Sequence, residues 1–307
     1  MNKNNDVLMS IRNLSKIFKS GILNPEYTVA AKDISFDIEK GKIISLIGES
    51  GSGKTTVGKL ILKLLEVSEG EIIYKGKNIS KIESKEETKE YYRRVQGIFQ
   101  DPFATFNPLY RVDRVFDMIF DSFDLGYEDK DKAIEEALYD VNLNPNRTLG
   151  KFPHQLSGGQ LQRLLIARAL LMDVDVLIAD ELISMLDAST RIGVLNLLVE
   201  TCKKHGMAVI FITHDLNLGY YISDKSLIMY KGRLVERGDT KKIYENATHP
   251  YTQMLFEAVP EIGERWDPDD EFLPEQVVSD VEEFYQNNQG KGFVEVEEDH
   301  RVLYSDK

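Results

Sequence analysis

Short apolar runs alternate with longer amphipathic segments along most of the chain. The runs at 42–47, 174–180, 208–213 and 226–230, which read KIISLI, VDVLIAD, AVIFIT and SLIMY, predict strands buried on both faces. Helical periodicity of the apolar residues predicts helices at 56–65, 131–141, 160–171 and 191–204. This alternation of strands and helices is typical of an α/β fold built around a parallel sheet.

Two other stretches favour antiparallel strands. The first 40 residues and the segment GEIIYKGKNI at 70–79 have a β-like pattern without intervening helices. We therefore expect an antiparallel β side layer beside the parallel sheet. There is no internal repeat, and no Pro- or Gly-rich linker divides the chain before residue 248 or so.

Composition places the chain among ordinary globular proteins. It has 307 residues, of which 42% are hydrophobic and 29% are charged. The single cysteine, Cys202, excludes an internal disulfide and a cysteine-built metal cluster, and it fits a reducing compartment. The first residues lack the apolar core of a signal peptide, and no run approaches the roughly 18 apolar residues of a membrane span. We expect neither element.

The net charge of −13 is unevenly distributed. Beyond residue 256 acidic residues crowd together, and only Arg265, Lys291, Arg301 and Lys307 oppose them. Residues 1–256 are therefore nearly balanced, without the basic face that nucleic-acid binding requires. The acidic tail is interpreted as a solvated surface.

The strongest local signal is GESGSGKT at 48–55, which follows an apolar strand and precedes a predicted helix. In the matching pattern G-x-x-x-x-G-K-[ST], a glycine-rich turn directs backbone N–H groups at phosphate oxygens, and the following helix adds its positive end. Lys54 is expected to reach the β- and γ-phosphates, and the Thr55 hydroxyl to bind Mg²⁺. The residues expected to contact the nucleotide here are Gly48, Glu49, Ser50, Gly51, Ser52, Gly53, Lys54, Thr55 and Thr56.

A second glycine-rich helix start follows at LSGGQLQR, residues 156–163. Ser157 can cap this helix, and the glycines leave N–H groups open toward an anion. One nucleotide does not need two such helix starts on one subunit. We therefore predict that Ser157, Gly159 and Gln160 contact a nucleotide held by a second subunit across a two-fold or pseudo-two-fold interface. A simple helix cap is the alternative.

The order and spacing of these motifs resemble one family. GESGSGKTT, LSGGQLQR, VDVLIADE, SMLD and FITHD together resemble the ATP-binding subunits of ABC transporters, over roughly residues 8–260. GIFQDPFATFNP at 97–108 and HPYTQMLFEAVP at 249–260 are similar to the oligopeptide and dipeptide importer branch, whose relatives also move nickel or oligosaccharides. The resemblance implies a P-loop NTPase cassette that hydrolyses ATP with Mg²⁺.

The resemblance assigns roles to two further residues in the first half of the chain. Phe18 matches the aromatic residue that stacks on adenine, with Tyr27 as the alternative and packing in the β core as the structural explanation for either. Gln100 matches the glutamine that touches Mg²⁺ and the attacking water, and its loop relays that contact to the membrane subunits.

Three residues in the second half complete the implied site. Asp180 matches the residue that holds Mg²⁺, Glu181 the base that orients and deprotonates water, and His214 the contact to the γ-phosphate. The implied catalytic residues are thus Lys54, Gln100, Glu181 and His214, and the metal ligands are Thr55, Gln100 and Asp180. Adjacent residues on a regular strand point to opposite faces, so we expect the backbone to turn between Asp180 and Glu181.

The segment after Glu181 departs from the family pattern. The family usually has proline and then a small or β-branched residue, followed by SALD, where this chain has Leu182, Ile183 and Met185. Loss of the proline frees one φ angle, and Met185 adds flexible apolar bulk near the predicted dimer interface. No donor, acceptor or metal ligand is lost, so we predict an active ATPase with altered packing.

The resemblance also implies partners and a location. They are a second ATPase subunit, with a paralogous chain favoured over a second copy, two integral-membrane permease subunits and an extracellular solute-binding protein. The expected location is the cytoplasmic face of the cell membrane. Two alternatives are a non-transport ATPase of the same fold, which usually has tandem cassettes or a coiled-coil insertion, and a module that clamps nucleotide with little hydrolysis.

The expected organisation has two lobes and a tail. Residues 1–101 and 166–250 form the nucleotide-binding core with its side layer, 102–165 form an inserted helical lobe, and 251–307 form a C-terminal extension. Some relatives hold an iron–sulfur cluster in this extension, but this chain has no cysteine there, so no cluster is expected. Alternation in GFVEVEEDHRVLY predicts a strand pair that packs on the core or on the partner ATPase.

Overall fold

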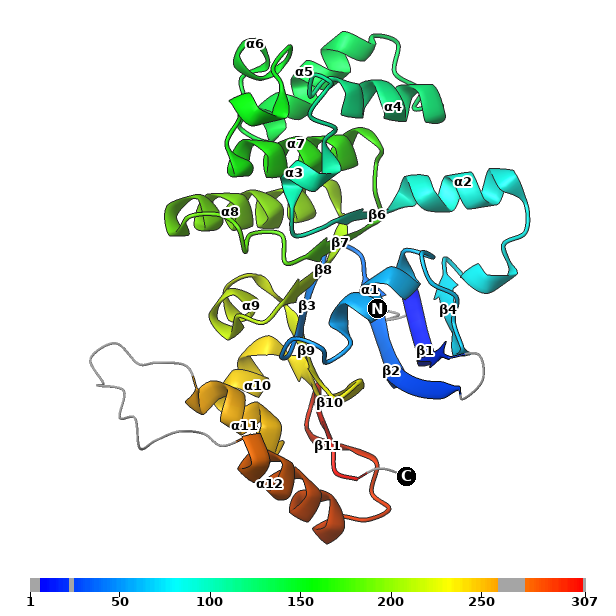
Figure 1. Cartoon of the computed structure of the whole chain (residues 1–307), viewed down its shortest axis with the longest axis vertical. Helices are drawn as coiled ribbons and strands as arrows, with labels where there is room; N and C mark the ends of the chain where they lie inside the picture. Colours follow the sequence, from blue (N-terminus) through cyan, green and yellow to red (C-terminus); the bar gives the residue numbers. More distant parts are fainter. Residues whose placement is uncertain (1–5, 22–24, 259–273, 306–307) are drawn as a thin grey trace.

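A computed structural model describes residues 6–21, 25–258 and 274–305 of the chain. Two β-sheets and a lobe of helices make up this part of the molecule (Figure 1). The main sheet runs through the centre, the helical lobe lies above it in the view of Figure 1, and the C-terminal elements lie below.

The main sheet has eight strands in the order β11-β12-β10-β9-β3-β8-β7-β6. Its strands are β3 Ile43–Ile47, β6 Val95–Ile98, β7 Val176–Asp180, β8 Ala208–Thr213, β9 Lys225–Tyr230, β10 Arg233–Asp239, β11 Phe293–Glu297 and β12 His300–Leu303. The pairs β9–β3, β3–β8, β8–β7 and β7–β6 are all parallel. Every residue of β3, β7 and β8 is buried. The predicted parallel-sheet core is confirmed.

Successive residues of the buried strands pack into two different hydrophobic cores. Val176 and Ile178 of β7 pack with the helix after β3 and with the side layer, whereas Leu177 and Ala179 pack with the helices of the other face. Both faces of the central strands are therefore covered. This explains why these strands read as continuous apolar runs in the sequence.

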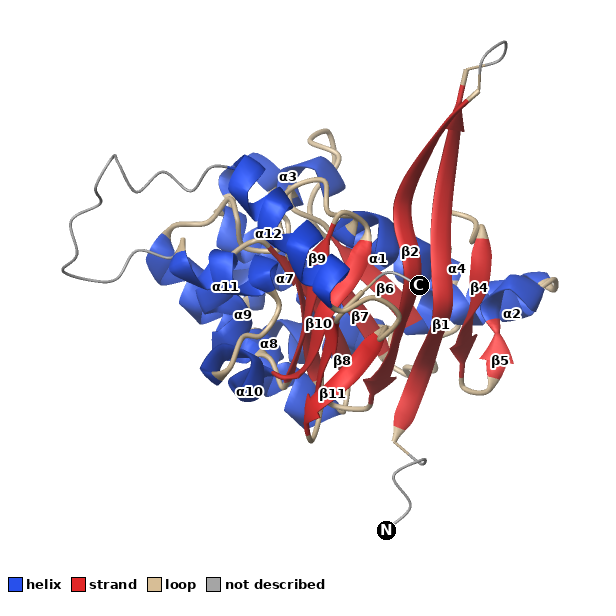
Figure 2. Cartoon of the chain, turned by 90° about the horizontal axis from the view of Figure 1, so that it is seen from below, coloured by secondary structure: helices blue, strands red, loops and turns tan. Residues whose placement is uncertain are grey.

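The predicted antiparallel side layer is also present. It contains β1 Val7–Ser20, β2 Glu26–Glu39, β4 Glu69–Tyr74 and β5 Lys77–Asn78, in the order β2-β1-β4-β5. The β1 and β2 strands are antiparallel, and their far ends project beyond the body of the molecule (Figure 2).

Helices cover both faces of the main sheet. Those outside the C-terminal region are α1 Lys54–Ile61, η2 Ile79–Lys81, α2 Lys85–Arg94, α3 Pro102–Thr105, α4 Arg114–Ser122, α5 Lys130–Asp140, α6 Pro145–Thr148, η3 Pro153–Gln155, α7 Gly158–Leu171, α8 Ala188–His205, α9 Leu216–Ile222 and α10 Thr240–Glu245. Within the described ranges, no helix combines the length and apolar character that a membrane crossing requires.

One helix is shorter than its sequence pattern predicts. The apolar periodicity extends to Leu65, but α1 ends at Ile61. Lys63 adopts a left-handed conformation with φ of 55°, and the N–H groups of Leu64 and Leu65 both return to the carbonyl of Lys59. The predicted C-terminal end of this helix is therefore wrong. A left-handed residue closes it in the way that a glycine often does.

The helical lobe joins the sheet through α7. This helix is continuous from Gly158 to Leu171, so the expected lobe boundary at residue 165 falls inside it. Leu161, Leu164 and Leu165 are buried among residues of α4, α5 and α8. The start of α7 belongs to the lobe (Figure 1), and near its end Arg168 donates to the Gln96 side chain of β6 at 3.1 Å.

The C-terminal region extends the main sheet and packs against it. The helices α11 Pro250–Glu257 and α12 Pro274–Asn287 precede the strands β11 and β12, which form an antiparallel hairpin. The predicted strand pair is confirmed, and β12 pairs with β10 at the edge of the main sheet. Val277 and Val281 of α12 share a core with Ile47 and Ile228 of the central strands. The expected division at residue 250 thus separates elements that share one core.

The hairpin approaches β10 too closely for a side chain at Gly238. A Cβ atom at this position would lie 2.0 Å from the carbonyl oxygen of Asp299 and 2.8 Å from the Cα of His300. We predict that Gly238→Ala displaces β12 and destabilises the protein by about 1–3 kcal/mol. Hydrogen exchange of the β12 amides should accelerate. Gly76→Ala is the control, because its methyl group would meet nothing within 4 Å and any backbone cost stays in its own turn. Unchanged β12 exchange in Gly238→Ala would contradict the prediction.

Candidate functional site

Residues 48–55 connect β3 to α1 and include three glycines with distinct environments. A Cβ atom on Gly48 would lie 2.2 Å from the carbonyl oxygen of Met229, and one on Gly53 would lie 2.2 Å from that of Ala30. Both positions therefore require glycine for packing. Gly51 has a left-handed φ of 83°, and a Cβ there would meet nothing within 4 Å. The loop therefore packs tightly against neighbouring strands at Gly48 and Gly53 and has free space at Gly51. A phosphate-binding loop needs such free space on the side that faces the ligand.

Lys54 is the first residue of α1, and its side chain folds back onto this loop. Its Nζ atom donates to the carbonyl oxygens of Gly48 and Glu49, each at 2.7 Å. Burial lowers the pKa of Lys54, while the nearby carboxylates of Glu181 and Asp180 oppose that shift. The ammonium group is fixed at the mouth of a concave turn, where it can neutralise a phosphate.

Four neighbouring parallel strands deliver the other predicted residues to the same edge of the sheet. The loop 48–55 follows β3, His214 follows β8, Asp180 ends β7, and Gln100 lies two residues beyond β6. Because β3, β8, β7 and β6 are neighbours in this order, their carboxyl ends form one row. The carboxyl edge of a parallel sheet is where ligands bind in open α/β folds.

The residues present fit a divalent cation at Asp180. This side chain is buried, and its Oδ1 atom has no hydrogen-bond partner within the described part of the chain. Burial raises the pKa of the Asp180 carboxyl, and a hydrogen bond from Thr55 opposes the shift. A buried carboxylate oxygen without a partner is costly, and an oxygen-preferring cation such as Mg²⁺ removes that cost.

The predicted backbone turn lies at Glu181. This residue has a left-handed φ of 49°, and its N–H donates to the carbonyl of Ile212 at 3.0 Å. The side chain thereby leaves the strand direction, and its Oε1 atom lies 3.2 Å from Nδ1 of His214. A cavity of about 90 Å³, also lined by Thr213, opens beside the carboxylate and the imidazole. This space can hold water.

The unusual apolar residues after Glu181 divide into two groups. Leu182 and Ile183 are buried in the core shared with the helical lobe, whereas Met185 is 60% exposed. Both bulky residues thus fill the interior, and Ile183 also lines the small cavity beside Glu181 and His214. Met185 is left on the surface beside the start of α8.

Arg191, which the sequence analysis missed, fastens this segment. Its guanidinium donates to the carbonyls of Leu186 at 2.7 Å and Ser184 at 3.1 Å. Ser184 in turn donates to the carbonyl of Glu181 through its N–H and its hydroxyl. No local motif distinguishes Arg191 from a surface arginine, since its role depends on how the loop folds back on α8.

The second glycine-rich helix start has neighbours of its own. Ser157 and Gln160 form a reciprocal capping box, with Gln160 N–H donating to Ser157 Oγ and Ser157 N–H donating to Gln160 Oε1. A Cβ on Gly159 would lie 2.3 Å from Cγ2 of Thr190, so α7 packs closely on the start of α8. These residues lie in the helical lobe, away from α1 (Figure 1). They are not part of the row described above.

Phe18 and Tyr27 both lie near the projecting end of the β1–β2 hairpin. Phe18 is 40% exposed and Tyr27 is 64% exposed, so neither ring is buried in the β core. The Nζ atom of Lys16 lies 5.2 Å from the centre of the Phe18 ring. Either ring is accessible to a flat ligand.

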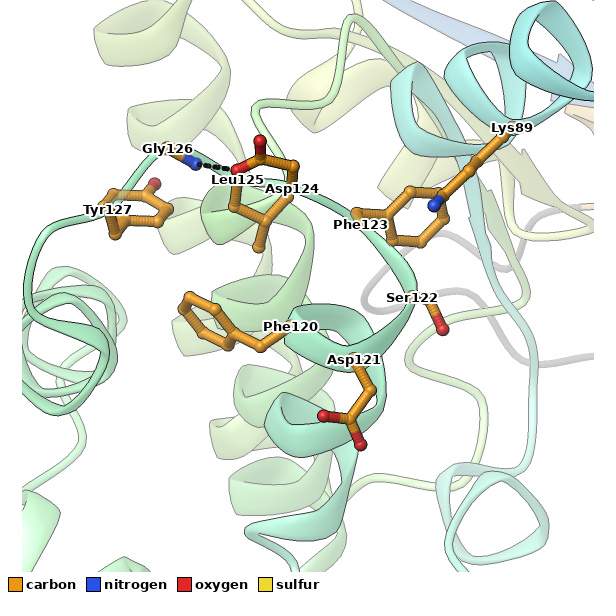
Figure 3. Close-up of a pocket in the computed structure, with 9 residues that line it drawn as sticks. All are labelled: Lys89, Phe120, Asp121, Ser122, Phe123, Asp124, Leu125, Gly126 and Tyr127. Atoms are coloured by element: carbon orange, nitrogen blue, oxygen red, sulfur yellow. Dashed lines mark hydrogen bonds between the residues drawn. The ribbon is translucent and has the colours of Figure 1, made fainter.

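A second cavity lies apart from the row of polar residues. It is formed by the end of α4 and the loop that follows (Figure 3). The lining residues are Lys89, Phe120, Asp121, Ser122, Phe123, Asp124, Leu125, Gly126 and Tyr127. None of them belongs to the predicted site.

Two family comparisons agree with this geometry. Residues 31–184 match the ABC transporter family, and residues 235–295 match the family described as oligopeptide/dipeptide transporter, C-terminal region. The oligopeptide transport ATP-binding protein OppF of Bacillus subtilis is 41% identical over 256 residues, which cover 82% of each chain. The oligopeptide transport ATP-binding protein AmiF of Streptococcus pneumoniae is 42% identical over 255 residues, again 82% of each.

Solved structures show the same fold. The cassette MJ0796, in a dimeric post-hydrolysis state bound to ADP and Pi, matches with a TM-score of 0.65 and 27% identity, covering 76% of this chain and 98% of that one. CbiO1 from Clostridium perfringens matches with a TM-score of 0.68 and 26% identity, covering 84% and 98%. The chain therefore belongs to the ABC transporter family, as an ATP-hydrolysing subunit whose C-terminal region is of the oligopeptide/dipeptide transporter type.

Proposed function

We propose that this subunit hydrolyses ATP to drive the import of oligopeptides through membrane permease subunits. The observation that carries the proposal is the juxtaposition of Glu181 and His214 on the row that also contains Lys54 and Asp180. The substrate class rests on the relatives, which are named as oligopeptide transport proteins.

Phosphoryl transfer depends on positioning and charge neutralisation more than on covalent help from the protein. In the proposed site Lys54 and backbone N–H groups of the glycine-rich loop bind the β- and γ-phosphates. Thr55, Gln100 and Asp180 would hold Mg²⁺, which supplies positive charge to the phosphate oxygens when bound. Phe18 stacks on the adenine ring, with its exposed face available at the hairpin.

Glu181 and His214 act on the water and the γ-phosphate. The Glu181 carboxylate accepts the proton of the attacking water, and the His214 imidazole donates to the phosphate from the next strand. Their contact at 3.2 Å places the two groups side by side. The left-handed turn at Glu181 lets its side chain act on the water while the Asp180 side chain would hold the metal. This arrangement argues against a subunit that only clamps nucleotide.

The proposed partners follow from two surfaces. Ser157, Gly159 and Gln160 lie on the helical lobe of the same chain, so they are proposed to complete the site of a second ATPase subunit. The segment after Gln100 exposes the apolar side chains of Phe103, Leu109 and Tyr110, which are proposed to contact a permease subunit. The subunit would then lie at the cytoplasmic face of the membrane, with a solute-binding protein delivering the peptide outside.

We predict that Glu181→Gln lowers ATP turnover of the assembled transporter by about 10²–10⁴-fold, the range that a general base contributes. The amide keeps the shape of the side chain but cannot accept a proton, so ATP binding should persist. Lys54→Ala is the contrasting variant, because it removes the phosphate contact and should weaken nucleotide binding itself. Parental turnover in Glu181→Gln would exclude this residue as the base.

We predict that Arg191→Lys loosens the loop that follows Glu181. A lysine cannot donate to both carbonyls as the planar guanidinium does. Hydrogen exchange of residues 181–187 should accelerate, and turnover should fall by up to about 100-fold, because small displacements of a reacting group are costly. Lys204→Ala, which removes a surface pair with Asp140 from the same helix, is the control. Equal exchange and turnover in the two variants would refute the clamping role.

We predict that the purified chain alone is mainly monomeric and has weak ATPase activity, because the second subunit is proposed to be a paralogous chain. The net charge of −13 also disfavours association of identical copies. Sedimentation at several protein concentrations, with and without MgATP, measures the state of association. A stable and fully active homodimer of this chain would contradict the choice of a paralogue.

A further inference from the structure

A tyrosine from the C-terminal region reaches the phosphate-binding loop. Tyr251 lies in the first turn of α11 and is fully buried, with its ring centre 4.3 Å from that of Tyr230. Its Oη atom accepts a hydrogen bond from the N–H of Glu49 at 3.0 Å. The carbonyl of the same residue, Glu49, accepts from Lys54 Nζ at 2.7 Å. The loop is therefore held at Glu49 from both sides, once by its own lysine and once by α11.

The position of Tyr251 is itself fixed by His249. This buried histidine caps α11, and its Nδ1 atom accepts from the Tyr251 N–H at 3.2 Å. Burial lowers the pKa of His249 to about 3, so the ring is neutral at neutral pH. Since Nδ1 is an acceptor, the proton is on Nε2, which donates to Tyr285 Oη of α12 at 3.2 Å. The cap thus connects α12 to the residue that touches the loop.

Glu236 links the residues that cap α11 to the β11–β12 hairpin through hydrogen bonds. This fully buried carboxylate on β10 accepts from the N–H groups of Thr248 at 2.9 Å and His249 at 3.1 Å. It also contacts Nε2 of the fully buried His300 on β12 at 2.6 Å. A continuous set of hydrogen bonds therefore runs from the hairpin to α11 and on to Glu49.

We propose that Tyr251 is a positioning residue for nucleotide, through which the docked C-terminal region fixes the shape of the phosphate-binding loop. The proposal rests on the proposed function, in which this loop binds ATP. A loop with several accessible conformations binds a phosphate chain only from the one that directs its N–H groups inward, and its apparent affinity falls with the population of that conformation. Through its hydrogen bond with the Glu49 N–H, Tyr251 restricts the conformation of this peptide group. The population of the conformation that binds phosphate rises as a result.

The test uses Tyr251→Phe in the full chain, which keeps the buried ring and removes only the acceptor oxygen. Loss of one buried hydrogen bond should weaken binding of a fluorescent ATP analogue by about fivefold to tenfold. ADP binding should weaken by a similar factor, since both nucleotides use the loop. In the assembled transporter the effect should fall on KM for ATP more than on kcat, and amides 48–53 should exchange faster.

Tyr244→Phe is the matched control. Its hydroxyl donates to the carbonyl of Leu216, and its ring packs against the same core as Tyr251. Both variants lose one largely buried hydroxyl contact and should show similar falls in melting temperature, but only Tyr251→Phe should weaken nucleotide binding. Parental affinity in Tyr251→Phe, or equal weakening in both variants, would overturn the positioning role. A parent chain that binds no ATP would instead refute the proposed function.

Discussion

Parallel pairing of β3, β8, β7 and β6 is the constraint on which the rest of the site depends. Each strand ends at the same edge of the sheet, and each contributes one polar element there: the phosphate-binding loop, His214, the Asp180–Glu181 pair and Gln100. The register is fixed because both faces of these strands are buried. A slip of one residue would exchange the two cores and bury the wrong side chains. The arrangement of the polar row and the packing of the cores are therefore set by the same pairing.

Bulky apolar residues follow Glu181 directly, next to the polar row. Leu182 and Ile183 are both buried in the apolar core that is shared with the helical lobe. The left-handed turn at Glu181 is held by backbone hydrogen bonds to Ile212 and Ser184, and neither bond involves the side chains of Leu182 and Ile183. Arg191 supplies a further restraint through the loop carbonyls.

The C-terminal region is integrated with the nucleotide-binding body. Its hairpin extends the main sheet through β10, and its helices share a core with Ile47, the residue that precedes Gly48. The oxygens of the buried Glu236 are satisfied by Thr248, His249 and His300, and those partners come from two separate segments, residues 248–249 and β12. Displacement of any one segment would leave a charge buried without its partners. The region therefore docks as a unit, close to the phosphate-binding loop.

The sequence alone determined the fold class and most of the polar row. The apolar runs, the helical periodicities and GESGSGKT are local patterns, so they predict strands, helices and a phosphate-binding turn without knowledge of distant contacts. Adjacency of Asp180 and Glu181 even predicts the turn between them, because a strand cannot direct neighbouring side chains to one site. The early end of α1 was missed because Lys63 has no residue-type signal for a left-handed conformation.

Only the tertiary structure decided which glycines are required by packing, where Met185 is exposed, and what holds the loops. The carbonyls that exclude a side chain at Gly48 and Gly53 belong to Met229 and Ala30, which lie on other strands. Arg191 acts through the fold of its own loop, and Tyr251 meets Glu49 across about two hundred residues of chain. Such contacts depend on strand order, register and the angle at which helices pack. Those quantities are properties of the assembled sheet and are not written in any short stretch of sequence.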